Sequence, residues 1–163
     1  MKKIVPIFIL ALAITVYFIF GSPSLRPAPP LSMSSLTGQL IDTQNRNNKP
    51  LLITFWATTC SSCVKEMPHL IELQKQYSDQ IDIAGIAMSY DKIEHIHEMV
   101  KRRQLNYSII YDQNDHIAQS FGGIRLTPTS FLISAQGQIV YQKIGDIDFK
   151  KLKQMLSSPK QQG

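Results

Sequence analysis

A short apolar run that ends just before a pair of cysteines limits the folds open to this chain more than any other feature. Residues 51–57 read LLITFWA and follow Pro50. So short and apolar a run is typical of a strand that is buried on both faces. Apolar residues then recur at helical spacing from Cys63 to Tyr77, which predicts an amphipathic helix. A buried strand therefore turns almost at once into a helix, and both cysteines lie at the turn.

The rest of the chain continues this alternation. Further strands are predicted over 81–88, 107–111, 130–134 and 139–144, and further helices over 93–104, 115–121 and 149–156. Residues 135–138 read AQGQ and predict a hairpin turn between the last two strands. This order of elements predicts an α/β fold with a mixed central sheet and helices on both of its faces.

The N-terminus carries a targeting signal. Lys2 and Lys3 precede 17 uncharged, almost wholly apolar residues, 4–20. As a helix this run spans about 25 Å, and with Gly21 and Ser22 it can cross a membrane. The positive-inside rule leaves the two lysines in the cytoplasm and the remaining chain outside. We expect residues 1–22 to be one transmembrane anchor; the alternative is a cleaved signal peptide.

The remaining residues predict one domain behind a spacer. Four prolines lie within residues 21–30, so we expect residues 23–30 to be a stiff linker. Residues 31–157 then form the domain and residues 158–163 a short tail. The net charge of +5 falls to +3 without Lys2 and Lys3 (5 − 2 = 3), which is too small to indicate nucleic-acid binding.

The two cysteines, Cys60 and Cys63, are the only ones in the chain. Outside the cytoplasm thiols tend to oxidise, and two cysteines three residues apart at a helix N-terminus favour a reversible disulfide. Cys60 lies at the positive end of the helix, which stabilises its thiolate and predicts that it is the attacking sulfur. Cys63, one turn further on, is then the resolving sulfur.

The same two sulfurs are also compatible with half of a zinc or copper site. Further ligands would have to come from the four histidines, which are His69, His95, His97 and His116. Their positions match no ligand spacing. The sequence therefore predicts neither a metal nor an organic cofactor.

Residues 55–68, FWATTCSSCVKEMP, resemble the active-site stretch of the thioredoxin superfamily. The resemblance is to the membrane-anchored TlpA/ResA-like thiol-disulfide oxidoreductases, with the CcmG/DsbE proteins as relatives. Glu66, Pro68 and the segment 127–133, TPTSFLI, extend the match. The resemblance implies a thioredoxin-like fold, an extra αβ insertion over 92–111 and a cis bond before Pro128.

The resemblance also assigns roles to residues. It favours Glu66 as the base that takes the proton of Cys63, whereas spacing alone is equally consistent with a solvated acid in the first helical turn. It places Trp56, Thr59, Thr127 and Pro128 in the surface that binds protein clients.

Three departures from the family pattern matter. Thr59 occupies the position where the family usually has Trp. Thr54 occupies the position where thioredoxins have a buried Asp. Ser61 and Ser62, between the cysteines, include neither the proline nor the charged residue or histidine of relatives.

These features predict a thiol-disulfide oxidoreductase that acts on protein disulfides in the periplasm or another space outside the cytoplasmic membrane. Without a charge between the cysteines to stabilise the reduced thiolate, we expect a reductant. The resemblance implies a membrane thiol reductase of the DsbD/CcdA type as electron donor and apocytochrome c as a client. The alternatives are a disulfide oxidase or isomerase of secreted proteins, or a copper-handling thiol protein.

Overall fold

The computed structural model describes residues 26–157. The predicted anchor, the first part of the predicted linker and the predicted tail lie outside these residues. Within residues 26–157, no helix is both long enough and apolar enough to cross a membrane.

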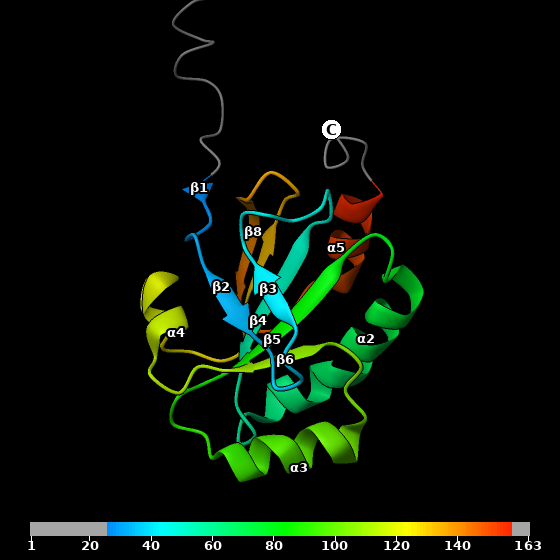
Figure 1. The fold of residues 1–163 in the computed structure, drawn as a ribbon. Helices are drawn as coiled ribbons and strands as arrows, with labels where there is room; N and C mark the ends of the chain where they lie inside the picture. The colour runs from blue at the N-terminus through cyan, green and yellow to red at the C-terminus, as the bar shows by residue number, and fades with distance from the viewer. Residues whose placement is uncertain (1–25, 158–163) are drawn as a thin grey trace, which may run out of the picture.

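The core of the fold is a sheet of six strands (Figure 1). Their order is β1 (Arg26–Pro27), β8 (Gln138–Ile144), β7 (Thr129–Ile133), β4 (Leu51–Trp56), β5 (Asp82–Ala87) and β6 (Ser108–Tyr111). β4, β5 and β6 run parallel, whereas β7 pairs antiparallel with both β4 and β8. The predicted mixed sheet is therefore confirmed, with the strand before the cysteines near its centre.

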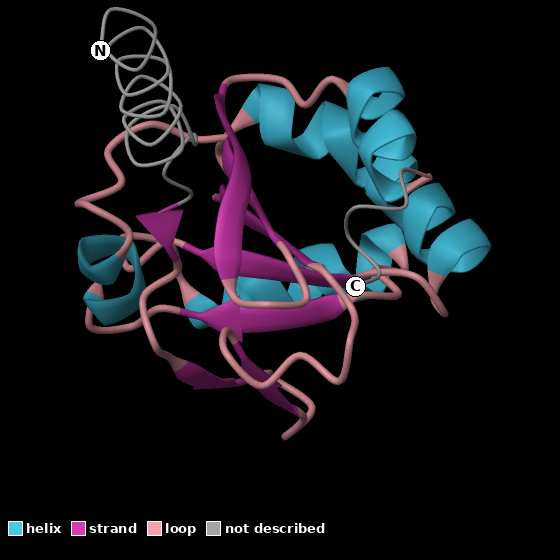
Figure 2. Ribbon diagram, turned by 90° about the horizontal axis from the view of Figure 1, so that it is seen from above, coloured by secondary structure: helices cyan, strands magenta, loops and turns pink. Residues whose placement is uncertain are grey.

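Both faces of the sheet are covered. One face packs against α2 (Ser61–Tyr77), α3 (Ile93–Arg103) and α5 (Phe149–Leu156). The other face packs against α4 (His116–Ser120) and the hairpin of β2 (Ser32–Ser34) and β3 (Leu40–Asp42). Figure 2 shows the strands between α4 and the other helices. The predicted helices on both faces are confirmed, and α3 with β6 occupies the region where the αβ insertion was expected.

Successive side chains of β4 point to opposite faces of the sheet and contribute to two separate apolar clusters. Leu52 and Trp56 belong to the cluster under α2, α3 and α5, whereas Ile53 and Phe55 belong to the opposite cluster. All six residues of β4 are buried, because a central strand covered on both sides has no face left for solvent.

The predicted linker is wrong for residues 26–30. Arg26 and Pro27 form β1, which pairs with the start of β8. Ala28 is buried, and its N–H donates to the carbonyl of Gly137 at 2.8 Å. The extended conformation that proline favours also suits an edge strand, where a missing N–H breaks no central ladder. The domain therefore includes residues before Leu31.

The strand register gives the sheet two distinct ends. Arg26 lies level with Ile139, Ile133 and Leu51 in successive strands. This is the end at which β4 begins, and Cys60 lies beyond the other end of β4. In Figure 1, β1 and the start of α2 accordingly lie at opposite ends of the molecule.

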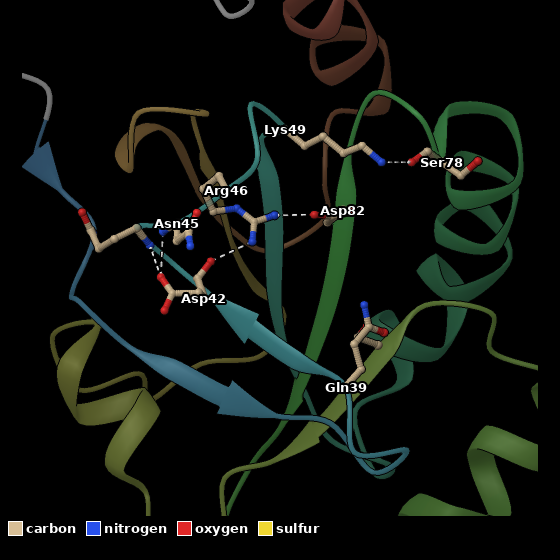
Figure 3. Close-up of polar contacts among 9 residues, drawn as sticks. Gln39, Asp42, Asn45, Arg46, Lys49, Ser78 and Asp82 are labelled. Atoms are coloured by element: carbon tan, nitrogen blue, oxygen red, sulfur yellow. Dashed lines mark hydrogen bonds and ion pairs between the residues drawn. The ribbon is translucent and has the colours of Figure 1, made fainter.

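A buried arginine braces the end at which β4 begins (Figure 3). The Nη2 atom of Arg46 lies 2.6 Å from Oδ2 of Asp82, and its Nη1 donates to the carbonyl of Asp42 at 2.7 Å. Lys49 Nζ donates to the carbonyl of Ser78, after α2, at 3.1 Å. These contacts join β3, β5 and the end of α2, far from the cysteines.

Candidate active site

The chain passes from β4 through a tight turn to the two cysteines. The N–H of Cys60 donates to the carbonyl of Ala57 at 3.1 Å, which closes the turn. Cys60 is the N-cap residue of α2, and its sulfur accepts a hydrogen bond from the N–H of Cys63 at 3.2 Å. The two sulfurs form a disulfide with an S–S distance of 2.00 Å. The pairing predicted from the sequence is present.

The two sulfurs differ in accessibility. Cys60 is partly exposed, whereas Cys63 is 3% exposed and belongs to the core under α2. A client can therefore approach Cys60 directly, while Cys63 lies behind it.

Glu66 lies one helical turn after Cys63 and is only 5% exposed. Its Oε1 accepts a hydrogen bond from the main-chain N–H of Ile147. Burial raises the pKa of the Glu66 carboxyl, the amide of Ile147 lowers it, and the negative charge of Asp146 raises it further. Glu66 is thus an interior carboxyl and not a solvated helix charge.

A cavity of about 10 Å³ joins Glu66 to Cys63. It is lined by Thr54, Trp56, Cys63, Glu66, Met67, Leu70 and Tyr107. Such a space is about the size of one water molecule. Burial, together with the charge of Glu66, raises the pKa of Tyr107. The carboxyl and the inner sulfur therefore share one small, mostly apolar compartment.

Trp56 differs from its predicted place. It is 3% exposed and lines the cavity beside Glu66, so a client cannot touch it in this state. This corrects the expectation that Trp56 forms part of the client-binding surface. Thr54, which occupies the position of the buried aspartate of thioredoxins, is also buried. Its Oγ1 accepts a hydrogen bond from Ser130 Oγ at 3.1 Å.

The other predicted client-binding residues lie around the disulfide. Thr59 is exposed directly before Cys60. The register places Thr129 opposite Phe55, so Thr127 and Pro128 lie beside the turn that carries Cys60. The Thr127–Pro128 bond is cis, as the resemblance implies. Pro128 is buried, as Trp56 is, which corrects the expectation that its side chain forms part of the client-binding surface. Its carbonyl accepts a hydrogen bond from the N–H of Gly145 at 2.8 Å.

Sequence reasoning missed two neighbours of Glu66. Ile147 acts through its main-chain amide, which has no signature in the sequence. Tyr107 lies just before β6, and only the pairing of β5 with β6 brings it beside Glu66. The predicted strand over 107–111 was a usable signal, because the β5–β6 pairing follows from the order of elements.

Comparisons with known proteins agree with this geometry. Residues 23–156 match the model of the Redoxin family. The chain is 30% identical over 132 residues to the thiol-disulfide oxidoreductase ResA of Bacillus thuringiensis subsp. konkukian, covering 80% of this chain and 75% of that protein. It is 28% identical over 137 residues to the thioredoxin-like protein YneN of Bacillus subtilis, covering 79% and 76% of the two chains.

Solved structures show the same fold. StoA from Bacillus subtilis superposes with a TM-score of 0.68 at 25% identity, covering 78% of this chain and 98% of StoA. A thioredoxin-family thiol:disulfide interchange protein from Chlorobium tepidum gives a TM-score of 0.73 at 24% identity, covering 83% and 98%. Together with the Cys60–Cys63 pair, these matches establish that the chain belongs to the Redoxin family and is a protein thiol-disulfide oxidoreductase with a thioredoxin-like fold.

Proposed function

We propose that the protein reduces disulfides in protein clients outside the cytoplasmic membrane, with Cys60 as the attacking sulfur. The observation that carries this proposal is the arrangement of Cys63 and Glu66 around one small cavity behind a partly exposed Cys60. It supplies an outer nucleophile, an inner resolving thiol and a buried carboxyl with a raised pKa to accept the proton of that thiol.

The proposed reaction has two steps. The Cys60 thiolate attacks a client disulfide, forms a mixed disulfide and releases one client sulfur as a thiolate, which takes a proton from water. Cys63 then gives its proton to Glu66 and attacks the Cys60 sulfur. The second client sulfur leaves as a thiolate and takes a proton from water, and Glu66 then releases its proton to the solvent. Two electrons pass to the client, and the Cys60–Cys63 bond forms.

Three exposed apolar side chains lie at the same end of the sheet as Cys60 and support protein clients as substrates. Tyr90 is 63% exposed, Leu126 63% and Ile144 57%. Tyr90 follows β5, Leu126 precedes β7, and Ile144 pairs with Thr129 at the end of β8. All three lie at the end of the sheet where β4 leads to Cys60. They offer apolar contact at the end of the sheet where Thr59 stands in place of the family's tryptophan.

We further propose that residues 4–20 tether the domain to the cytoplasmic membrane. The support is their length and apolar character after Lys2 and Lys3. We also propose a membrane thiol reductase of the DsbD/CcdA type as electron donor and apocytochrome c as a candidate client, on the resemblance of residues 55–68 to the TlpA/ResA-like oxidoreductases.

The reduction potential of the Cys60–Cys63 pair tests the direction of electron flow. A reductant is expected nearer the about −270 mV of thioredoxin than the about −120 mV of a strong oxidant. A value near the latter would favour the oxidase or isomerase function instead. Stoichiometric copper on the protein as isolated, together with no mixed disulfides on a Cys63→Ser variant, would favour copper handling.

Fractionation tests the tether. The full-length protein should sediment with membranes and be digested by protease added outside. A soluble form starting near Leu25 would instead show that the N-terminal segment is cleaved.

A further inference from the structure

Asp91 is a buried acid beside the turn that carries Cys60. It lies in the loop between β5 and α3 and is 7% exposed. Its Oδ2 accepts a hydrogen bond from the main-chain N–H of Thr58 at 2.5 Å. Its Oδ1 accepts from Thr58 Oγ1 at 2.7 Å and from the N–H of Lys92 at 3.0 Å. Three donors converge on the two oxygens, as suits an ionised carboxylate, which only accepts hydrogen bonds.

The backbone around Asp91 is itself held in place. Its N–H donates to the carbonyl of Met88 at 3.0 Å, and its carbonyl accepts from Tyr111 Oη at 3.0 Å. The carboxylate therefore has a fixed position relative to the ends of β5 and β6.

Thr58 connects the Asp91 carboxylate to the turn that carries Cys60. It is the second residue of the turn closed by the hydrogen bond from Cys60 to Ala57. Only Thr59 separates Thr58 from Cys60, so the Asp91 carboxylate lies within roughly 10 Å of Cys60. A buried charge at this distance is only partly screened by solvent and salt. The negative charge of Asp91 therefore raises the free energy of the Cys60 thiolate that forms when the disulfide is reduced.

We propose that Asp91 is a positioning residue that, through Thr58, holds a fixed negative charge beside Cys60 and thereby shifts the thiol–disulfide equilibrium toward the disulfide. The proposal deepens the proposed reductant function and rests on it, because a dithiol whose thiolate is destabilised gives up its electrons more readily. Asp91 would then act in the same direction as the absence of a thiolate-stabilising charge at Ser61 and Ser62, because both leave the reduced form less stable.

The test is a redox titration of the full chain with glutathione. Two glutathione thiols lose two electrons and two protons to become one glutathione disulfide. The Cys60–Cys63 bond takes up both electrons and one of the protons to give the Cys60 thiolate and the Cys63 thiol, and the other proton goes to the buffer. For Asp91→Asn, which removes the charge and keeps the size, the equilibrium constant for this reduction should rise about tenfold. That rise corresponds to about 30 mV.

Two further variants separate charge from loop geometry and from net charge. Thr58→Val removes the hydroxyl contact but keeps the carboxylate and the main-chain contact, so the constant should change less than threefold. Asp79→Asn removes a charge between α2 and β5, at the other end of the sheet, and should change the constant less than twofold. Equal shifts in Asp91→Asn and Thr58→Val would overturn the proposal, because loop geometry would then be the cause.

A second neutral variant guards against misfolding. Asp91→Ser also removes the charge and keeps a hydroxyl that can bond to the turn, and cooperative unfolding shows which variants are folded. Constants within twofold of the wild type in the folded neutral variants would also overturn the proposal. An oxidising potential of the wild-type protein would reject the reductant function alone, because the Asp91 test depends only on differences between variants.

Discussion

The main-chain N–H of Ile147 donates a hydrogen bond to the carboxylate of Glu66 across 81 residues of sequence. This contact joins the redox helix α2 to the loop before α5. It gives Glu66 a fixed partner in the interior, where burial raises the pKa of its carboxyl. The helix that carries the cysteines and the C-terminal part of the domain therefore meet at the proposed base.

Glu66→Gln should slow the reduction of a client disulfide about 100-fold at neutral pH, because it removes the group that accepts the proton of Cys63. The deficit should shrink as pH rises, because hydroxide then deprotonates Cys63. Stopped-flow measurement of the chemical step checks this. Glu72→Gln, an exposed site on the same helix, is the control. A folded Glu66→Gln protein with the wild-type rate would show that Glu66 is not the base.

Glu66 should also make stability depend on pH. Its pKa is raised above the ordinary 4.5. Between that value and its folded-state pKa, the folded protein holds a proton that the unfolded chain has released. The free energy of unfolding therefore falls as pH rises through this window, and above it the loss is complete. The Gln variant lacks this titration.

Urea unfolding of both proteins, from about pH 4 to about pH 8, measures this effect. The stability of the wild type relative to Glu66→Gln should decline across the window. Parallel curves would mean that burial does not perturb Glu66 in solution.

The cysteines should divide the reaction unequally. In the reduced domain, alkylation should label Cys60 before Cys63, because Cys60 is partly exposed and Cys63 is buried. Cys63→Ser leaves the mixed disulfide unresolved, so client adducts that dissolve on reduction should accumulate. Non-reducing gels and mass spectrometry detect them. Adducts formed by Cys60→Ser and not by Cys63→Ser would reverse the order of attack.

Gly85→Ala should disturb the cavity without touching a reactive group. A Cβ at Gly85 would lie 3.0 Å from Ile109 Cδ1, 3.1 Å from Trp56 Nε1 and 3.2 Å from Tyr107 Cε2. Such overpacking costs about 1–3 kcal/mol of unfolding free energy. Denaturant unfolding measures the cost, and the rate of client reduction should fall with it as Trp56 and Tyr107 move. An unchanged free energy of unfolding would show that Ile109, Trp56 and Tyr107 can move aside without cost.

The main elements of the fold could be predicted because their local patterns agree with their burial. The helix predicted over 149–156 matches α5, and the strand predicted over 81–88 differs from β5 by one residue at each end. β1, β2 and β3 were missed. Each has two or three residues, too few to show a period, and β1 contains a proline that favoured a linker.

The residues of the candidate site also fall into those that the sequence could predict and those that depend on the tertiary structure. Cys60 and Cys63 were predictable because they are the only cysteines and lie at a strand–helix junction. The burial of Trp56 beside Glu66 depends on which face of β4 meets α2, and the anchoring of Glu66 depends on a distant main-chain amide. Asp91 could have been singled out from the sequence, because it follows a parallel strand next to β4, and polar groups often gather at that end of such strands.

The register that sets Arg26 level with Leu51 determines how far the disulfide lies from the N-terminal end of the domain. Six residues of β4, about 20 Å of strand, separate this level from the start of the turn that carries the disulfide. Under the proposed N-terminal tether, the domain itself would act as a spacer that holds the disulfide away from the lipid. The proposed tether would then favour partners whose cysteines lie well clear of the bilayer, and the proposed membrane-bound electron donor would have to present its thiols on a part that projects into the aqueous space.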